Sequence, residues 1–580
     1  MKKLIATLLT LVLLLSLCAP AMAEAAHAIT SSVVPFDFSD GGISVDAKLY
    51  FLDGANDLPY IEANDWLELY NTLLNALNTN MLGLENGAVT YSMAAEGPIV
   101  TYTRHNKDLQ AYDNGVTMVL DFDKDTINFI DYNLFMQKAS SGTLLDMTAL
   151  NYVNKSGEAS VLQKVDRGTF DRYGDELVLP LRDYGIDLVE QDGLYLIPLQ
   201  TLSDFIMTTV GYNFYFNGQR VFVDDNTTKF ADDYYAAPTA ERSEALVKYG
   251  YGELCMMLDY MYGMKDTHEI TSFAKLFHEV GFDAFLKGSS VADADKAIYR
   301  LLTDYLDDNH TAWHAYSYLT GPIDYTAPMG MGDAQFNNQA RTYMLARREF
   351  FPEGVPGYQE VGNTAYITFD QFQLGSVDPE YYYSVEDPME FDDTDTIGLM
   401  IKAHAQITRE NSPIENVVID LSCNSGGMAD TAVFVIAWFL GEASIGMKDA
   451  MTGAMCASTY RADINRDRQF DEKDTLVGKK LYCMISPMSF SCGNLVPCIF
   501  KESGKVTLLG RTSGGGSCVV LNVSSPWGTS FQISGPRRLS FMKNGSFYNV
   551  DRGADPDILI SQPEKYYDRQ ALTDYINSIY

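Results

Sequence analysis

The sequence predicts a multidomain α/β protein. Its 580 residues exceed the size of about 250–300 residues at which one hydrophobic core stops growing, so we expect two to four domains. From residue 362 onward, apolar strand-like segments alternate with helical segments, which is typical of an α/β layer with crossover helices. Residues 241–319 have helical periodicity, as over 273–285 and 292–306, whereas residues 30–230 mix short strands with amphipathic stretches.

Composition and charge exclude several classes of protein. Hydrophobic residues make up 46% and charged residues 21% of the chain, which is ordinary for a globular protein and argues against disorder. The formal net charge of −35 predicts a surface that repels nucleic acid and anionic membranes. We therefore expect no nucleic-acid partner. We also expect no transmembrane segment, because no run after the N-terminal segment is apolar enough to span a bilayer.

Residues 1–23 have the pattern of a secretory signal peptide. Two lysines precede the uncharged apolar run from Leu4 to Leu17, and Ala21-Met22-Ala23 is a small-residue cleavage signal. The run is shorter than the roughly 20 residues of a bilayer-spanning helix. We expect a secreted, extracellular protein cleaved near Ala23. A lipid anchor on Cys18 is the alternative, but Leu17 stands where that signal needs a small residue.

The cysteines favour neither a disulfide scaffold nor a zinc site. Of the eight, Cys18 lies in the signal segment, Cys255 stands alone, and the others lie in the last third of the chain. An odd number remains after cleavage, and no Cys-x-x-Cys pair occurs. We expect buried free thiols, with one or two bridges as the alternative.

Residues 30–230 contain an internal echo that predicts an α+β repeat domain. A strand, an Asp-Gly turn and a Pro-marked extended piece lead to the amphipathic stretch Trp66 to Leu77. The same order recurs in Gln191 to Leu199 and Leu202 to Val210, followed by short alternating strands. The pattern resembles the copper amine oxidase N-terminal-like domain of secreted bacterial proteins. That resemblance implies a module that binds the cell envelope or another protein, without a copper site.

Three segments carry residue types used in nucleophilic catalysis. In Val417 to Gly427 an apolar strand ends in a Gly-Gly turn that opens a helix and directs backbone N–H groups toward a ligand. In Leu481 to Asn494 a strand again leads into a helix, with Ser491 near the junction, and the helical segment before Thr311 ends in a polar turn with His310. Each has a structural alternative: a tight turn, a helix N-cap, and a surface or helix-capping histidine.

Together these segments resemble the S41 peptidases, the family of tail-specific and tricorn-type serine proteases. The resemblance implies a crotonase-like ββα spiral core over residues 355–580, preceded by a helical segment over residues 240–320 that carries the histidine. The family's usual PDZ domain has no room between them. The matching motifs are Ile419-Asp420-Leu421-x-x-Asn424-x-Gly426-Gly427, Ser489-Phe490-Ser491, Leu509 to Gly515, and Gly553-Ala554-Asp555-Pro556-Asp557.

The resemblance implies a Ser/His mechanism. In Ser/Lys members the lysine would stand in Gly514-Gly515-Gly516, where this chain has none. Asp308-Asn309-His310-Thr311 matches the family's histidine motif instead, which makes Ser491 the nucleophile and His310 the general base. A serine hydroxyl is a poor nucleophile at neutral pH, and imidazole has a suitable pKa to take its proton.

The remaining catalytic groups follow from the same motifs. An acidic residue before the closing glycine orients the catalytic residues in the histidine branch of the family, and Asp551 is the candidate here. The oxyanion hole is expected from the backbone N–H of Gly426 or Gly427 together with that of Cys492, because both groups lie at strand-to-helix turns.

Residues 463–474 have the spacing of an EF-hand or dockerin-like calcium loop. Oxygen-bearing residues occupy positions 1, 3, 5, 7, 9 and 12, and such hard ligands suit Ca²⁺. Arg468 replaces the usual turn glycine, and the last ligand is aspartate in place of glutamate; the alternative is a solvated acidic loop. We expect a structural Ca²⁺ and no cofactor for catalysis. The predicted ligands are Asp463, Asn465, Asp467, Gln469, Asp471 and Asp474.

The sequence therefore predicts a secreted serine endopeptidase that cleaves extracellular proteins or peptides. One alternative is a catalytically inactive S41-like protein that binds peptides without cutting them. Another is a cell-envelope adhesion or scaffold protein in which the N-terminal repeat domain is the working part.

Overall fold

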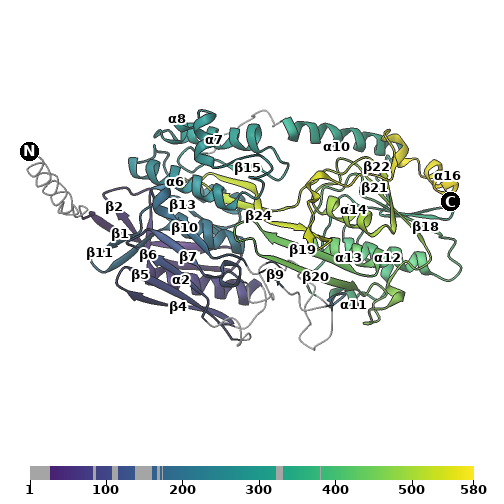
Figure 1. Cartoon of the computed structure of the whole chain (residues 1–580), viewed down its shortest axis with the longest axis horizontal. Coiled ribbons are helices and arrows are strands. Elements are labelled where there is room, and N and C mark those ends of the chain that lie inside the picture. Colours follow the sequence, from purple (N-terminus) through teal and green to yellow (C-terminus); the bar gives the residue numbers. More distant parts are fainter. Residues whose placement is uncertain are drawn as a thin grey trace, which may run out of the picture.

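The computed structural model describes residues 26–81, 86–107, 115–137, 145, 160–165, 170–172, 174–321, 331–378 and 380–579. The expected signal peptide lies outside these residues. Figure 1 shows two lobes side by side, an N-terminal lobe in purple to teal and a C-terminal lobe in green to yellow. Among the described residues, no helix is both long and apolar enough to cross a membrane.

The N-terminal lobe contains a 7-stranded sheet, with the strand order β11-β12-β3-β2-β1-β14-β13. β1 (Ile29–Phe38) and β2 (Ile43–Leu52) form its long hairpin, and β3 (Tyr60–Glu62) leads into α2 (Ala63–Ala76). Trp66, one of the largest fully buried side chains, anchors α2 against this sheet. The other strands are β11 (Val189–Gln191), β12 (Leu194–Pro198), β13 (Asn213–Phe216) and β14 (Val221–Asp224). Both halves of the region thus share one sheet, and the predicted repeat stays a prediction.

A second, 5-stranded antiparallel sheet in this lobe has the order β10-β7-β6-β5-β4. Alternate residues of β5 point into the core, which is the pattern of a half-buried strand. Its strands are β4 (Val89–Glu96), β5 (Ile99–Asn106), β6 (Thr117–Asp121), β7 (Thr126–Phe129) and β10 (Leu177–Pro180).

The helical segment follows and packs on the N-terminal lobe. Serine side chains cap three of its helices, because Ser243, Ser272 and Ser290 each accept a hydrogen bond from a backbone N–H in the first turn. Residues 273–285 form two helices instead of one, since Gly281 adopts φ 78° between them. The helices are α6 (Glu244–Met261), α7 (Phe273–Glu279), α8 (Asp283–Leu286), α9 (Val291–Arg300) and a π-helix at Leu301–Leu306.

The C-terminal lobe is built on a 6-stranded sheet with the order β16-β17-β18-β21-β22-β27. All pairings after the β16–β17 hairpin are parallel, and α-helices lie in the connections from β17 to β18, from β18 to β21 and from β21 to β22. The strands are β16 (Tyr358–Val361), β17 (Thr364–Thr368), β18 (Asn416–Asp420), β21 (Lys480–Ile485), β22 (Val506–Gly510) and β27 (Ile558–Leu559). The observed strands and helices support a mixed α/β architecture.

Helices cover both faces of this sheet. Val417 and Ile419 of β18 pack in the cluster that includes α12 (Thr396–Thr408), α13 (Ala429–Leu440) and α14 (Cys492–Ser503). Val418 points to the opposite face, where the long helix α10 (Met331–Phe350) and the C-terminal helices α15 (Glu564–Tyr567) and α16 (Arg569–Ile579) pack. Because both faces are buried, β18 reads as a continuous apolar run in the sequence.

One antiparallel sheet joins the two lobes. The first residues of β24 (Ser530–Ser540) pair with β15 (Ala312–Ala315), and its last residues pair with β19 (Ala443–Asp449). Further along the sheet, β20 (Met455–Ala462) pairs with strands from the N-terminal region, β8 (Leu162–Lys164) and β9 (Phe170–Arg172), while β23 (Cys518–Ser524) pairs with β24. Figure 1 shows β24 reaching from the C-terminal lobe into the N-terminal lobe.

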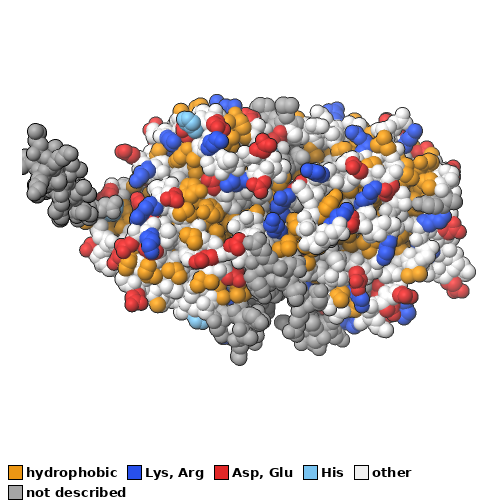
Figure 2. All heavy atoms as spheres, viewed as in Figure 1, with side chains coloured by type: hydrophobic (Ala, Val, Ile, Leu, Met, Phe, Trp, Pro, Cys, Tyr) orange, Lys and Arg blue, Asp and Glu red, His pale blue; other side chains and the backbone are white. Residues whose placement is uncertain are grey.

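The surface carries both signs of charge. On the face drawn in Figure 2, lysine and arginine side chains are interspersed with aspartate and glutamate and with hydrophobic patches.

The seven described cysteines are all buried free thiols, and none of them forms a disulfide. This agrees with the expectation of buried free thiols and not with the alternative of one or two disulfide bridges.

Candidate active site

Ser491 occupies a strained backbone position at the start of α14. Its φ of 55° and ψ of −124° lie in a region that L-residues other than glycine rarely adopt. Its backbone N–H donates to the carbonyl of Gly515 at 2.8 Å, and its own carbonyl accepts the N–H groups of Asn494 and Leu495. Such strain persists where the surroundings enforce it and is frequent at active sites.

The Ser491 hydroxyl does not cap the helix that it precedes. Ser491 thus stands at the N-cap position of α14 without the capping hydrogen bond that the structural alternative expects. Two other serines in the same turn are buried and structural: Ser486 donates its hydroxyl to the Ser422 carbonyl, and Ser489 donates to the Leu421 carbonyl at 2.7 Å. Ser491 is half-buried, and its hydroxyl has no protein partner among the described residues.

His310 is held by a short loop between the last helical turn and β15. Asp308 accepts the backbone N–H groups of His310 at 3.1 Å and Thr311 at 2.8 Å. The Tyr262 hydroxyl donates to the other oxygen of Asp308 at 2.8 Å, and the Gln532 side chain donates to the His310 carbonyl at 2.7 Å. These bonds fix the loop backbone and leave the imidazole to pack elsewhere.

The structure brings the histidine loop to the serine turn. The imidazole of His310 packs on the ring of Phe490, with the ring centroids 4.6 Å apart, and Phe490 directly precedes Ser491. Only 7% of His310 is exposed. Burial lowers the pKa of His310, and the negative charges of Asp308 and Asp551 partly offset this effect. A histidine that is neutral at physiological pH can accept a proton.

Asp551 lies near His310 but forms its hydrogen bonds elsewhere. One carboxylate oxygen accepts the backbone N–H of Ser517 at 2.7 Å, and the other accepts the Ser517 hydroxyl and the guanidinium of Arg538. Within the described part of the chain, the Asp551 carboxylate has no hydrogen bond to the imidazole. Its influence on His310 is therefore electrostatic in this conformation.

The Gly-Gly turn after β18 packs directly against the nucleophile. A Cβ on Gly426 would lie 2.6 Å from the Cβ of Ser491, so only glycine fits there. The Gly426 N–H donates to the side-chain oxygen of Asn424 at 2.9 Å. Burial raises the pKa of the Cys492 thiol to about 12, and the nearby Gly427 N–H offsets a part of this rise. The backbone N–H of Cys492 has no acceptor among the described residues. Of the three predicted donors, Gly427 and Cys492 are therefore the two whose N–H groups are not already bound to an oxygen.

The three glycines after β22 leave no room for a lysine side chain. Gly515 adopts φ 83°, and a Cβ on it would lie 2.4 Å from the Asp551 carbonyl. A Cβ on Gly516 would lie 2.7 Å from the Phe490 ring. This segment passes between the Phe490 side chain and the Asp551 backbone, which gives a physical reason for the missing lysine.

The comparison with protein families decides the assignment of this lobe. Residues 363–560 match the family model Peptidase family S41. The C-terminal lobe contains a serine-type peptidase domain of family S41. The match includes the Ser491 turn and Asp551, whereas His310 lies before it.

Other known proteins resemble parts of the chain. The Chlamydia pneumoniae protein CPj1016/CpB1054 is 29% identical over 102 residues, which cover 17% of this chain and 16% of that protein. Among solved structures, the photosystem II D1 C-terminal processing protease is 14% identical with a TM-score of 0.24, covering 34% of this chain and 42% of that one. Mature CPAF is 12% identical with a TM-score of 0.26, covering 37% and 52%. The tricorn protease is 13% identical with a TM-score of 0.23, covering 84% and 46%.

Some residues that hold the candidate active site in place were not apparent from the sequence. Arg538 and Ser517 fix Asp551, but both lie on or beside strands with no motif of their own. Asn494 donates to the Val550 carbonyl at 2.9 Å and accepts from Ser513, so it ties the Asp551 turn to α14. Its place three residues after the nucleophile, in the first turn of a helix, is the one local signal that points to it.

The predicted calcium loop, which precedes β21, is closed by its own backbone N–H groups. The buried carboxylate of Asp463 accepts the N–H of Asp467 at 3.1 Å and that of Arg468 at 2.8 Å. Arg468 has φ 61°, the conformation that a glycine would adopt at this position. Asp474 accepts the N–H of Ile464 at 3.0 Å, and burial raises its pKa to about 6. In the described ranges, no three His, Cys, Asp or Glu side chains are grouped to hold a metal ion.

Proposed function

We propose that this chain is a serine endopeptidase that hydrolyses peptide bonds of extracellular proteins or peptides. One observation carries the proposal: the unengaged hydroxyl of Ser491 lies on a strained turn next to Phe490, on which the His310 imidazole packs. The family match of the surrounding lobe supports a peptidase reaction.

In the proposed reaction, His310 removes the proton of the Ser491 hydroxyl as its oxygen attacks the peptide carbonyl carbon. The imidazolium then donates this proton to the leaving amine, and a water molecule hydrolyses the acyl-enzyme with His310 as base. Hydrogen bonds between such groups are often long without substrate and tighten when substrate binds. The lowered pKa of His310 keeps it in the basic form needed for the first step.

We assign the oxyanion hole to the N–H groups of Gly427 and Cys492. Removing one such donor typically costs about 2.7–4 kcal/mol of transition-state stabilisation. Asp551 would stabilise the imidazolium through its charge while Arg538 holds its carboxylate in place. Its role is thus to favour the charged intermediate.

Three further expectations belong to this proposal. The small-residue signal at Ala21 to Ala23 supports secretion, and the family resemblance supports a crotonase-like spiral in the C-terminal lobe. The N-terminal lobe is proposed as an interaction module for the cell envelope or another protein.

Fluorophosphonate labelling tests the proposed chemistry. The wild-type protein should label at Ser491, and the Ser491→Ala and His310→Ala variants should not. Two controls should still label: Ser561→Ala at an exposed serine of the same lobe, and His278→Ala at a histidine whose side chain is 81% exposed. Labelling that persists in Ser491→Ala would reject the assigned nucleophile.

An inactive, peptide-binding S41-like protein is the second candidate. The observation that favours it is the engagement of Asp551 with Arg538 and Ser517, with no hydrogen bond to the imidazole among the described residues. If the wild-type protein does not label but retains a peptide from an extracellular protein digest, this alternative replaces the peptidase.

A further inference from the structure

We propose that Arg569, in the C-terminal helix α16, is a positioning residue for the oxyanion-binding turn. This turn, residues 421–427, carries Gly427 and packs against Ser491. The inference deepens the proposed peptidase function and rests on it. Arg569 lies beyond the segment that matches the S41 family model, which ends at residue 560.

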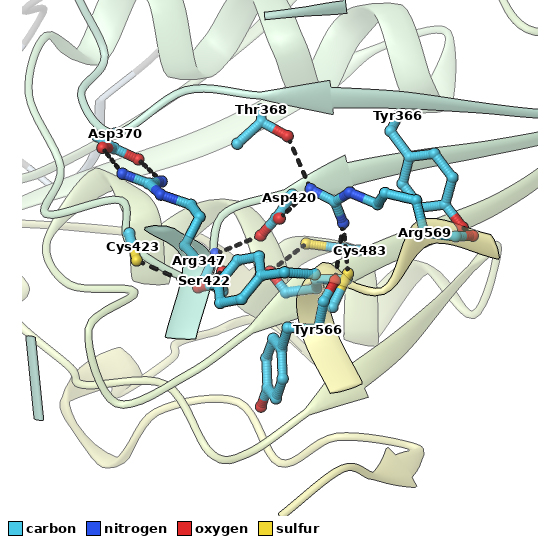
Figure 3. A network of polar contacts seen from close by, with 12 residues as sticks. Arg347, Tyr366, Thr368, Asp370, Asp420, Ser422, Cys423, Cys483, Tyr566 and Arg569 are labelled. Carbon is cyan, nitrogen blue, oxygen red and sulfur yellow. Dashed lines mark hydrogen bonds and ion pairs between the residues drawn. The ribbon is translucent and has the colours of Figure 1, made fainter. Parts of the chain in front are cut away.

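The guanidinium of Arg569 is buried where β18 ends. It donates to the Asp420 carboxylate at 2.6 Å and to the Thr368 hydroxyl at 3.0 Å, and it lies 4.5 Å from the centroid of the Tyr366 ring. The side chains of Arg569 and Asp420 are 4% and 1% exposed. Figure 3 shows this arrangement, with Arg569 reaching between Tyr366 and Asp420.

The Asp420 carboxylate links Arg569 to the oxyanion-binding turn. Its second oxygen accepts the backbone N–H of Ser422 at 3.0 Å. The same carboxyl group therefore joins α16 to the second residue of the turn. One guanidinium nitrogen of Arg569 donates to both Asp420 and the Thr368 hydroxyl, while the other donates to the Tyr566 carbonyl at 3.0 Å. A charged donor with two arms is needed here because a single ammonium nitrogen could not reach both sides.

Neighbouring residues of the C-terminal segment contact both catalytic turns. The Tyr567 hydroxyl lies 3.0 Å from the Ser422 hydroxyl and 3.4 Å from the Cys423 sulfur. The Tyr566 hydroxyl donates at 3.0 Å to the carbonyl of Ile485, the last residue of the strand before the nucleophile turn. The C-terminal segment thus fixes the two turns relative to each other.

The middle of the oxyanion-binding turn contacts the nucleophile turn. The Asn424 carbonyl accepts the N–H of Phe490 at 3.0 Å, and the Asn424 side chain accepts the Gly426 N–H. On the opposite side, the Ser425 N–H donates at 3.0 Å to the carbonyl of Asp370, whose carboxylate forms a two-point ion pair with Arg347. A shift at Ser422 would therefore move the Gly427 N–H relative to Ser491.

A stability role alone does not explain the buried ion pair between Arg569 and Asp420. Well-packed apolar residues of similar volume often stabilise a core as well as a buried ion pair, or better. An apolar pair could not, however, bond the Ser422 N–H and hold the turn at a fixed place. We therefore assign to the Arg569–Asp420 pair the role of positioning the backbone N–H groups of the oxyanion hole.

The test compares Arg569→Lys with a matched control, Arg409→Lys. Lysine keeps the positive charge at residue 569 but loses the planar fork. Arg409 forms a two-point pair with Glu360 at the surface of the same lobe. The rate of fluorophosphonate labelling at Ser491 should fall about 10- to 100-fold in Arg569→Lys, the range expected for small misplacements near a reacting centre. The control should keep the wild-type rate.

Further readouts separate positioning from loss of fold. With fluorescein-labelled casein as substrate, kcat should fall more than KM, and the acid limb of the pH profile should stay unchanged because His310 is untouched. Hydrogen exchange of the amides in residues 421–427 should accelerate in Arg569→Lys and not in the control. If Arg569→Lys does not fold, Asp420→Asn, which keeps the side-chain shape, is expected to show the same losses.

The outcomes distinguish this inference from the proposed function. Wild-type labelling with an unchanged rate in Arg569→Lys overturns the positioning role and leaves the peptidase standing. If the wild-type protein does not label, the peptidase proposal fails, and amide exchange alone decides the inference. Unchanged exchange in residues 421–427 would then overturn it.

Discussion

At the scale of single residues, the site combines a strained serine with a buried histidine. Ser491 adopts a backbone conformation that favours glycine, and His310 is held with its imidazole shielded from water by the Phe490 ring. Both features cost free energy in the folded protein. They therefore give predictions that concern these two residues alone.

Replacing Ser491 with glycine should stabilise the protein relative to replacement with alanine. Both variants lack the hydroxyl, but alanine keeps the Cβ that is unfavourable at φ 55°. We expect the free energy of unfolding to be about 1 kcal/mol higher for Ser491→Gly, since strain of this kind costs roughly 1–3 kcal/mol and glycine's own entropy offsets part of the gain. Urea unfolding measures the difference. Equal stability of the two variants would contradict the strain.

The pH dependence of Ser491 labelling should report the protonation of His310. Because burial lowers the pKa of His310, the acid limb should lie below the ordinary histidine value of about 6.5. The Asp551 charge stabilises the imidazolium and raises this pKa, so Asp551→Asn should move the limb to lower pH. Asp551→Asn also removes the ion pair between Asp551 and Arg538. Arg538→Gln removes the same ion pair but keeps the Asp551 charge, so it serves as the control. An unmoved limb in Asp551→Asn would argue against coupling to His310.

At the scale of elements, the sequence identified the parallel strands better than the antiparallel ones. Continuous apolar runs such as Val417 to Ile419 are typical of strands buried on both faces, and the structure confirms β18 and β21. β24 was not predicted because its residues lie in two different cores along one strand. α10 was missed because its buried Tyr343 and Ala346 alternate with exposed Met344 and Leu345, which breaks a clean helical stripe.

The candidate catalytic residues were predictable where they lie in short sequence motifs. The Ser491 turn and the His310 turn each have a local pattern, and the structure brings them together through Phe490. Arg569 has no such pattern, because its partner Asp420 is far away along the chain and only the packing of α16 makes them neighbours. Long-range contacts of this kind depend on tertiary structure.

The loop of residues 463–474 gives a prediction about calcium. If the loop binds Ca²⁺ as its spacing predicts, adding Ca²⁺ at about 100 times its Kd should stabilise the protein by about 2.7 kcal/mol. A thermal melt with Ca²⁺ and with EGTA measures the shift. Asp463→Asn should abolish it, whereas Glu442→Gln, at an exposed residue outside the loop, should not. Identical melts with Ca²⁺ and EGTA would contradict the calcium prediction.

At the scale of the whole molecule, a buried pair of carboxyl groups lies in the core of the N-terminal lobe, next to a strand contributed from late in the sequence. Glu253 of α6 accepts the Thr201 hydroxyl at 2.7 Å, and Asp204 accepts the Gln200 side chain at 2.7 Å. Gln200 also donates to the Ser524 carbonyl in β23 at 3.1 Å. Burial raises the pKa of both acids, which face each other without a neighbouring cation among the described residues.

This pair should make the protein less stable as the pH rises. The folded state holds a proton that the unfolded chain releases above the ordinary glutamate pKa of about 4.3, so stability falls from there up to the raised pKa of the pair. Glu253→Gln removes the ionisable group and should flatten this dependence and gain stability at pH 8. Glu244→Gln, at the exposed start of the same helix, should match the wild type. Urea unfolding at pH 5 and pH 8 measures both effects.

β24 is the element that most constrains how this protein can be dissected. A recombinant fragment trimmed to residues 363–560 would retain the nucleophile and lose its base, because His310 lies before residue 363. The loop of His310 normally contacts the first residues of β24 through β15 and Gln532. In the same fragment the first residues of β24 would keep β23 on one side but lose β15 on the other, which exposes an unpaired strand edge. We expect it to aggregate or remain inert, so biochemical work should begin from the intact polypeptide.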